Sequence, residues 1–174
     1  EDTAVSIAVL GNDTDINGDP LAIVAMGAAP NGTVTSDGRA LVFTPTLNFY
    51  GTTVFTYTVS DGNFDSDATV MITVTPVNDR PVAVDDNTTA AAGHAQVIAV
   101  LANDGDVDGD ALTVQVVGAP AHGTATAGAD NTITYTPAAS YSGTDQFTYS
   151  VTDPGGLSAT ASVKLSITNQ APVA

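Results

Sequence analysis

Two short loops of this chain carry oxygen-bearing side chains on alternate residues, with a glycine at the turn of each. The first loop, "NDTDINGD", contains Asp13, Asp15, Asn17, Gly18 and Asp19. The second loop, "NDGDVDGD", contains Asp104, Asp106, Asp108, Gly109 and Asp110. A hard cation such as Ca²⁺ takes several oxygen ligands, and a loop of the form Asp-x-Asp-x-Asn/Asp-Gly supplies them from alternate positions. Both loops are therefore candidate calcium sites.

Neither loop has the sequence of an EF-hand. An EF-hand places a bidentate Glu at the last position of its loop, and the matching residues here are Val24 and Gln115. The stretches that follow, "LAIVAM" and "LTVQVV", alternate as strands do and do not indicate a helix. The remaining calcium ligands must therefore come from another part of the chain.

The segment "TPVNDRPVAVDDN" offers such ligands between the two loops. Its oxygen-bearing side chains are Asn78, Asp79, Asp85 and Asp86. Two prolines hold this segment extended, because proline fixes its own φ and disfavours a helical residue before it. If the first and last strands of a sandwich run in the same direction, the loop after the first strand lies at the end where the chain leaves. We therefore expect Asp15 and Asp19 to meet these linker residues at the junction, with Asp153 facing it from the second copy.

This arrangement also predicts that the two loops differ in calcium affinity. The residue that follows the second copy in the place of Asp79 is Gln170, which lacks a carboxylate. We therefore expect the loop at 104–110 to bind calcium more weakly than the loop at 13–19.

An internal repeat organises the whole chain. Asp104 follows Asp13 by 91 residues (104 − 13), and the two loops align without a gap. Further along, "TPTLNFYGTTVFTYTVSDG" corresponds to "TPAASYSGTDQFTYSVTDP". The repeat predicts two homologous domains, at residues 1–79 and 80–174, each of a size that suits a small β-sandwich. The first residues, "EDTAVS", contain neither an initiator Met nor a signal peptide, and we expect the chain to be a piece of a longer protein.

The elements that must position these loops are strands. The segments "TTVFTYTVSDG" and "DATVMITVTPV" alternate with period two and are rich in β-branched residues. Turn signals such as "NG", "DG" and "GG" recur about every ten residues, which favours about seven short strands per repeat in an antiparallel sandwich. The aromatic residues expected in the two cores are Phe43, Phe49, Phe55 and Tyr57, and Tyr135, Tyr141, Phe147 and Tyr149.

Composition narrows the possible partners. The chain has 19 Asp and Glu against 3 Lys and Arg, which gives a net charge of −16. Nucleic acids and anionic membranes attract basic surfaces, so neither is an expected partner, whereas cations are. Because the chain has no cysteine, disulfides and thiolate metal sites are excluded. Its apolar runs are shorter than the roughly 18 residues that a membrane helix needs, so we expect no membrane insertion.

The repeated motifs resemble a known group of domains over essentially the whole chain. "ND-x-D-x-DGD-x-L", "TP-x-x-x-x-x-G-T", "F-T-Y-x-V-x-D" and "V-N-D-x-P-V-A-x-D-D" are similar to bacterial cadherin-like and VCBS-type repeats, which occur in tandem in long surface proteins and type I-secreted (RTX-type) adhesins. The resemblance implies two tandem immunoglobulin-like (cadherin-like) antiparallel β-sandwiches joined by a short Pro-containing linker. It further implies an extracellular, secreted or cell-surface location and calcium at the domain joints. The linker "VNDRP" is similar to the cadherin joint, and Glu1 matches an acidic position at the start of such repeats.

Simpler interpretations compete with the calcium sites. Asp-Gly and Asn-Gly loops are ordinary turns whose side chains cap nearby backbone groups, and Asp85 with Asp86 could be a solvated pair. His94 and His122 are isolated from each other, which disfavours zinc. The paired acids of glycoside hydrolysis would need a cleft, and adjacent acids on an extended linker point in opposite directions. We therefore expect no enzyme activity.

Two noncatalytic functions fit the sequence. The first is an extender, in which calcium stiffens the joints between neighbouring repeats and holds an adhesive tip away from a cell. The second is a calcium-dependent module that binds a surface polysaccharide or like domains on another cell. Sugar sites usually show exposed aromatic residues, and this chain has no Trp and only 6% aromatic residues. The composition therefore favours the extender.

Overall fold

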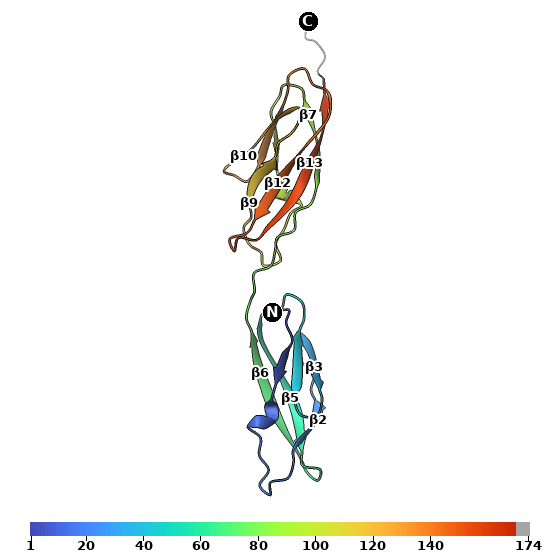
Figure 1. Ribbon diagram of the computed structural model, residues 1–174, viewed down its shortest axis with the longest axis vertical. Helices are drawn as coiled ribbons and strands as arrows, with labels where there is room; N and C mark the ends of the chain where they lie inside the picture. Colours follow the sequence, from blue (N-terminus) through green and yellow to red (C-terminus); the bar gives the residue numbers. More distant parts are fainter. Residues whose placement is uncertain (170–174) are drawn as a thin grey trace. The chain divides into compact units, whose positions relative to one another are not determined.

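The computed structural model describes residues 1–169 and is built almost entirely of strands (Figure 1). The chain divides into two units, Glu1–Val77 and Asn78–Ala174. We refer to them as unit 1 and unit 2. Each is an immunoglobulin-like β-sandwich, as the resemblance implied. The division falls two residues before the predicted boundary because Asn78 and Asp79 hydrogen-bond to unit 2, at Asp153 and Asp108.

Unit 1 packs two three-stranded sheets face to face. Its elements in chain order are β1 (Val5–Ile7), the 3-10 turn η1 (Val9–Gly11), β2 (Ala22–Met26), β3 (Gly32–Ser36), β4 (Leu41–Pro45), β5 (Gly51–Ser60) and β6 (Asp65–Val74). One sheet has the order β1-β4-β3 and the other β2-β5-β6, with antiparallel neighbours throughout. The segment that follows the first acidic loop is strand β2, which confirms that this loop does not open a helix.

Unit 2 repeats this plan with one further strand. Its elements are β7 (Asp86–Ala91), β8 (Gln96–Ile98), the 3-10 turn η2 (Val100–Ala102), β9 (Thr113–Gly118), β10 (Gly123–Ala127), β11 (Ile133–Pro137), β12 (Gly143–Thr152) and β13 (Ser158–Thr168). The sheet orders are β10-β11-β8 and β7-β13-β12-β9. The additional strand β7 pairs in parallel with β13, which departs from the wholly antiparallel sandwich that we expected.

Each core lies between the two sheets of its unit and follows the period-two pattern. Six of the eight predicted aromatic core residues are buried, and the other two, Phe49 and Tyr141, are partly buried against the same cores. In unit 1 the rings of Phe43 and Phe55 stack with their centroids 6.1 Å apart. In unit 2 Tyr135 and Phe147 stack at 6.0 Å. These residues come from facing sheets, so the aromatic pairs join the two layers.

The ends of each sandwich can be told apart by the long hairpin. In unit 1 the turn between β5 and β6 marks what we call the hairpin end. Strand β6 runs from there to the opposite end, where the amino group of Glu1 donates a hydrogen bond to the carbonyl of Thr75 (3.0 Å). In unit 2 the turn between β12 and β13 marks the hairpin end, and the N–H of Ala92 donates to the carbonyl of Thr168 at the opposite end (3.0 Å).

Candidate metal centre

Both acidic loops close on themselves through their own carboxylates. In the first loop Oδ1 of Asp15 accepts the backbone N–H groups of Asn17 (2.7 Å) and Asp19 (3.0 Å). In the second loop Oδ1 of Asp106 accepts the N–H of Asp108 (2.9 Å). The glycines that follow have φ of 80° and 77°, a left-handed conformation that glycine adopts without strain. The repeated sequence therefore gives two loops with a similar turn.

A buried tyrosine anchors the base of each loop to the core. The hydroxyl of Tyr57 donates to Oδ2 of Asp13 (2.8 Å), and that of Tyr149 donates to Oδ2 of Asp104 (3.0 Å). Burial, and then the hydrogen bond to Asp13, raise the pKa of Tyr57 to about 12. Burial and the carboxylate of Asp104 raise the pKa of Tyr149 further. Both tyrosines therefore stay protonated and act as hydrogen-bond donors.

The second loop brings three carboxylates together. Oxygens of Asp106, Asp108 and Asp110 lie within 4.8 Å of one another. Calcium binds oxygen at about 2.3–2.6 Å, so two ligands on opposite sides of one ion are about 5 Å apart. Oδ2 of Asp106 is buried, and no residue among 1–169 donates a hydrogen bond to it. A buried carboxylate oxygen without a donor is costly, and a cation would satisfy it. This donor set fits a hard divalent cation.

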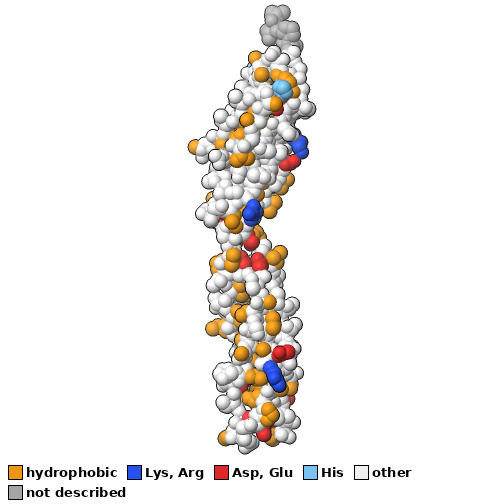
Figure 2. Space-filling model, viewed as in Figure 1, with side chains coloured by type: hydrophobic (Ala, Val, Ile, Leu, Met, Phe, Trp, Pro, Cys, Tyr) orange, Lys and Arg blue, Asp and Glu red, His pale blue; other side chains and the backbone are white. Residues whose placement is uncertain are grey.

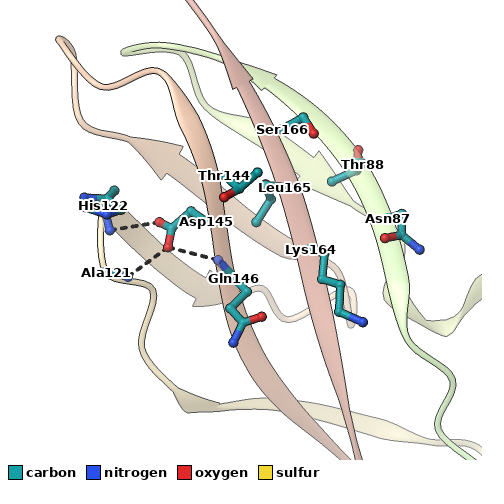
Figure 3. Close-up of a pocket in the computed structure, with 10 residues that line it drawn as sticks. All are labelled: Asn87, Thr88, Ala121, His122, Thr144, Asp145, Gln146, Lys164, Leu165 and Ser166. Carbon is teal, nitrogen blue, oxygen red and sulfur yellow. Dashed lines mark hydrogen bonds between the residues drawn. The ribbon is translucent and has the colours of Figure 1, made fainter.

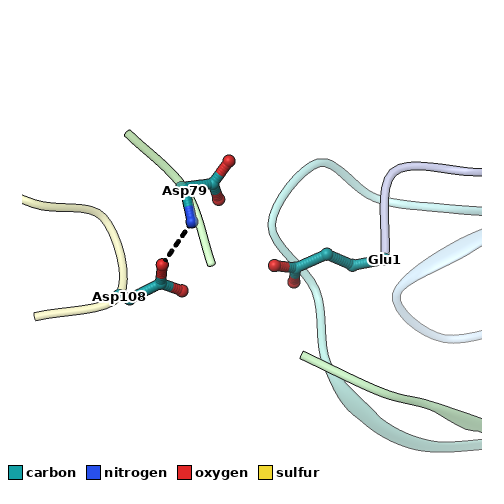
Figure 4. A group of neighbouring side chains, drawn as sticks. All are labelled: Glu1, Asp79 and Asp108. Carbon is teal, nitrogen blue, oxygen red and sulfur yellow. Dashed lines mark hydrogen bonds between the residues drawn. The ribbon is translucent and has the colours of Figure 1, made fainter. Parts of the chain in front are cut away.

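The start of unit 2 docks on this loop. Val82 and Gly105 exchange two backbone hydrogen bonds (2.7 and 3.0 Å). Oδ2 of Asp108 accepts the N–H of Asp79 at 2.7 Å (Figure 4). Oδ1 of Asp104 likewise accepts the N–H of Val84 (2.7 Å). The linker segment therefore lies against the carboxylate-rich loop.

The β12–β13 turn adds another carboxylate at the same end of unit 2. Asp153 is buried and accepts hydrogen bonds from the side chain of Asn78 (2.9 Å) and the N–H of Leu157 (2.9 Å). Burial by itself raises the pKa of Asp153, but these bonds and others from the turn outweigh it, so the pKa is lowered. Burial, followed by the charges of Asp106, Asp108 and Asp153, raises the pKa of Asp110. The hairpin end of unit 2 is thus a region of unbalanced negative charge.

The two adjacent acids of the linker point in different directions, as expected. Asp85 forms an ion pair with Lys164 (2.8 Å) and accepts the N–H of Ser162 (2.9 Å), so it faces β13 and not the loop. Asp86 accepts a hydrogen bond from the hydroxyl of Tyr149 (3.1 Å) and lies beside Asp104. Burial, with a smaller contribution from the charge of Asp104, raises the pKa of Asp86. Of this pair, Asp86 alone belongs to the loop region.

The first loop does not lie where we predicted. Asp13 is held by Tyr57 near the hairpin end of unit 1, and a hollow of about 320 Å³ there is lined by Asp13, Asp15, Asp61 and Asp65. The chain leaves unit 1 at the opposite end, beyond Thr75. The prediction that Asp15 and Asp19 meet Asn78, Asp79, Asp85 and Asp86 is therefore wrong. The reason is strand direction: β1 and β6 run in opposite directions, so the loop after β1 and the chain exit lie at opposite ends.

The predicted difference in calcium affinity between the two loops depended on placing the first loop at the junction. It is the second loop, Asp104 to Asp110, that lies with Asn78, Asp79, Asp86 and Asp153. Among residues 1–169, the acids of the first loop do not bring three carboxylate oxygens within 4.8 Å of one another. Gln170, on which the comparison also depended, lies outside the described residues.

Sequence reasoning missed the two tyrosine anchors. Tyr57 and Tyr149 were assigned to the core for their rings alone. A signal was present, because a buried Tyr hydroxyl needs a hydrogen-bond partner, and each repeat has both this Tyr and the Asp at the start of the loop. Asp145 was also missed: it is buried in unit 2 and accepts hydrogen bonds from Tyr135 and from three backbone N–H groups.

A hollow of about 450 Å³ lies on unit 2 away from the acidic loop (Figure 3). Residues of β7, β12 and β13 line it, including Asn87, Gln146 and Lys164. His122 also lines it, and its ring stacks on Tyr141 with the centroids 3.8 Å apart. Basic side chains are sparse and isolated on the face drawn in Figure 2.

Comparison with known proteins identifies the family. The family model described as bacterial Ig domain matches residues 1–75 and 78–166, one match in each unit. The chain belongs to the bacterial Ig domain family. No curated protein matches its sequence. Among residues 1–169, no helix is long and apolar enough to cross a membrane.

Solved cadherin structures share the fold of these two bacterial Ig domains. Human protocadherin-24 EC1-2 is 20% identical with a TM-score of 0.60, and the match covers 90% of this chain and 86% of that one. Protocadherin gammaB7 EC3-6 is 16% identical with a TM-score of 0.52, over 90% of this chain and 42% of that one. An endo-fucoidan hydrolase of glycoside hydrolase family 107 is 28% identical with a TM-score of 0.44, over 89% of this chain. The chain spans about a quarter (24%) of that hydrolase. The cadherin likeness shows that the two sandwiches have a cadherin-like fold.

Proposed function

We propose that this chain provides calcium-binding repeats of a long secreted or cell-surface protein, and that calcium stiffens the linker between repeats. Its partners are then the neighbouring repeats of the same chain. The family and the cadherin-like fold support an extracellular, adhesion-type module. The single observation that carries the calcium site is Oδ2 of Asp106, a buried carboxylate oxygen without a donor within residues 1–169, in a cluster with Asp108 and Asp110.

In this proposal calcium binds at the hairpin end of unit 2. Asp106, Asp108 and Asp110 supply the first oxygens, and calcium relieves the repulsion among them. Further oxygens would come from nearby carboxylates such as Asp79 and Asp153, since calcium takes six to eight ligands. The ion binds the folded form alone, so it stabilises unit 2 by mass action.

Calcium at this position would also restrict the linker. Asn78 and Asp79 follow Val77, the last residue of unit 1, and both already hydrogen-bond to unit 2. Without the ion these bonds must hold against the mutual repulsion of the surrounding carboxylates. When calcium is bound, these carboxylates are attracted to the same cation instead of repelling one another. The linker therefore separates from unit 2 less often. Repeated along an array, such joints would carry load from a cell surface.

Small-angle scattering of the chain in chelator and in calcium tests the extender function. We expect a narrower distance distribution in calcium, with little change in circular dichroism. Asp106→Asn is the control, because Asn keeps the oxygen that caps the loop but removes the charge, and its scattering should not respond to calcium. Identical wild-type profiles, with calcium shown to be bound, would rule out linker stiffening.

A second candidate function rests on the hollow of unit 2. The side-chain amides of Asn87 and Gln146 and the ammonium of Lys164 line it, and such groups bind sugar hydroxyls. A calcium-dependent module that binds surface polysaccharide, or like domains on another cell, would use a surface of this kind. Glycan-array screening with and without calcium separates this function from the extender. Calcium-dependent retention of a glycan would favour the binding module.

A further inference from the structure

Three polar residues that line the hollow of unit 2 are cross-strand neighbours. Asn87 on β7 pairs with Lys164 on β13, and Lys164 pairs with Gln146 on β12. All three are exposed, whereas the residues that follow on β12 and β13, Phe147 and Leu165, lie in the core. The sheet therefore holds two side-chain amides and an ammonium in one row on its outer face.

A buried carboxylate holds one wall of the hollow in place. Asp145 is 7% exposed, and its oxygens accept the N–H groups of Ala121 (3.0 Å) and His122 (2.9 Å), as Figure 3 shows. They also accept the hydroxyl of Tyr135 (2.8 Å) and the N–H of Gln146 (2.9 Å). Burial by itself raises the pKa of Asp145, but these hydrogen bonds outweigh it, so the pKa is lowered. The ionised carboxylate therefore ties the segment that carries His122 to the sheet.

The ring of His122 is held at this wall. It stacks on Tyr141 with the two planes 10° apart, and the hydroxyl of Tyr141 donates to the carbonyl of Thr144 (2.7 Å). His122 is nevertheless exposed and lines the hollow. Because Tyr141 covers one face of the ring, a ligand would pack against the other face. A sugar presents apolar C–H groups to such a ring and hydroxyls to nearby amides.

The charged side chains that line the hollow are already paired within the protein. The ammonium of Lys164 binds the carboxylate of Asp85 (2.8 Å), and Asp145 is occupied by its four donors. The whole chain carries a net charge of −16. An anionic ligand would therefore meet overall repulsion without an unpaired cation to bind. An uncharged ligand with hydroxyl groups suits these residues better.

Unit 1 has different side chains on the equivalent part of its sheet. Val54 pairs with Met71 in the long hairpin of unit 1, as Gln146 pairs with Lys164 in unit 2. Two apolar residues thus replace an amide and an ammonium. The polar row is therefore a feature of unit 2 and does not follow from the shared fold alone.

We propose that the hollow of unit 2 binds an uncharged glycan. Asn87 and Gln146 hydrogen-bond its hydroxyls, and His122 packs against a sugar ring. The volume of about 450 Å³ lies in the range of ligand sites, which is about 300–1,000 Å³. This inference rests on the second candidate function above, because it uses the same hollow. It narrows the ligand from surface polysaccharide in general to neutral glycans.

Titration of the whole chain with neutral hexasaccharides of glucose, mannose and galactose tests the site. A hyaluronan hexasaccharide is the anionic probe of matched size, and amide resonances are followed in calcium. We expect saturable shifts at Asn87, His122 and Gln146 with at least one neutral hexasaccharide, and no saturable binding of the hyaluronan probe.

Two variants test the residues, and a third is the control. Gln146→Val introduces the residue of unit 1, and His122→Ala removes the ring; each should bind the neutral hexasaccharide at least about fivefold more weakly. Gln115→Val makes the matched change at an exposed position of β9 in the same sheet, outside the residues that line the hollow. It should bind like the wild type.

The possible failures can be told apart. If no hexasaccharide bound at millimolar concentration, both this inference and the second candidate function would be wrong. Binding of the hyaluronan probe at the same residues would overturn the neutral class alone and leave a glycan-binding module. Equal affinity of Gln146→Val and Gln115→Val would show that the glycan binds elsewhere on the chain. None of these results bears on calcium binding by the loop at 104–110.

Discussion

The hydroxyl of Tyr149 donates a hydrogen bond to Oδ2 of Asp104, with the two oxygens 3.0 Å apart. The tyrosine is fully buried in the core of unit 2, whereas Asp104 begins the acidic loop. The bond therefore links the sandwich to the loop that gathers Asp106, Asp108 and Asp110. Tyr57 and Asp13 make the same bond in unit 1 (2.8 Å), so the anchor belongs to the repeat, whereas the carboxylate cluster is found in unit 2.

Tyr149→Phe should destabilise unit 2. The substitution keeps the buried ring and removes a donor to Asp104 and Asp86, which leaves those carboxylates poorly satisfied. We expect a loss of about 1–2 kcal/mol in the free energy of unfolding, measured as a lower urea midpoint of the transition assigned to unit 2. Tyr57→Phe is the control and should shift the unit 1 transition alone. An unchanged unit 2 midpoint would show that the anchor contributes nothing to stability.

The pH dependence of stability in chelator should depend on Asp110. Burial and the neighbouring acids raise its pKa above the ordinary value of 3.8, so the folded form binds this proton more tightly than the unfolded chain. Its contribution to stability therefore increases as pH falls toward the raised pKa and is lost as pH rises. We expect Asp110→Asn to raise the melting temperature of the calcium-free chain near pH 7 and to flatten the change in melting temperature as the pH falls toward the ordinary value of 3.8.

Asp19→Asn is the matched control for this experiment, since Asp19 holds the same place in the first loop. It should leave the pH dependence of unit 2 as it is in the wild type. If the melting temperature of Asp110→Asn changed with pH as steeply as that of the wild type, the charge of Asp110 would not be the source of the pH dependence. In calcium the same variant should be less stable than the wild type, because it has lost a ligand.

Asp85→Asn should leave calcium affinity within about twofold of the wild type. The side chain of Asp85 faces Lys164 at 2.8 Å, and that ammonium with the N–H of Ser162 holds the pKa of Asp85 below its ordinary value. Asp86→Asn changes the neighbouring acid, which lies beside Asp104, and should weaken calcium binding. Calorimetric titration with calcium distinguishes the two variants. A large loss of calcium affinity in Asp85→Asn would show that Asp85 is part of the calcium site.

Local pattern predicted most of the fold. Alternation identified β5 and β6, and the repeat of Phe55 and Tyr57 in Phe147 and Tyr149 identified the equivalent core positions. These features depend on neighbours in the sequence and on burial, both of which period two encodes. The candidate ligands of the second loop were also found from spacing, because an Asp-x-Asp-x-Asp-Gly loop closes on itself whatever surrounds it.

The end of the sandwich at which each loop lies could not be read from the same pattern. It depends on the direction of the strand before the loop, and in unit 2 the strand that runs parallel to β13 is β7, not β8. The sequence "DNTTAA" of β7 has weak alternation, and its first two residues, Asp86 and Asn87, were placed in the linker segment. Because β7 runs parallel to β13, the next strand, β8, runs back toward the hairpin end of unit 2. The second loop, which follows β8, therefore contacts Asp79.

The most direct test of the account is a calcium titration followed by amide resonances in the wild type, Asp106→Asn and Asp15→Asn. We predict saturable shifts in residues 104–110 and at Asp79 in the wild type, about tenfold or weaker affinity in Asp106→Asn, and little change at these residues in Asp15→Asn. Shifts confined to residues 13–19, equal damage from the two substitutions, or no response to millimolar calcium would contradict a calcium site at the hairpin end of unit 2.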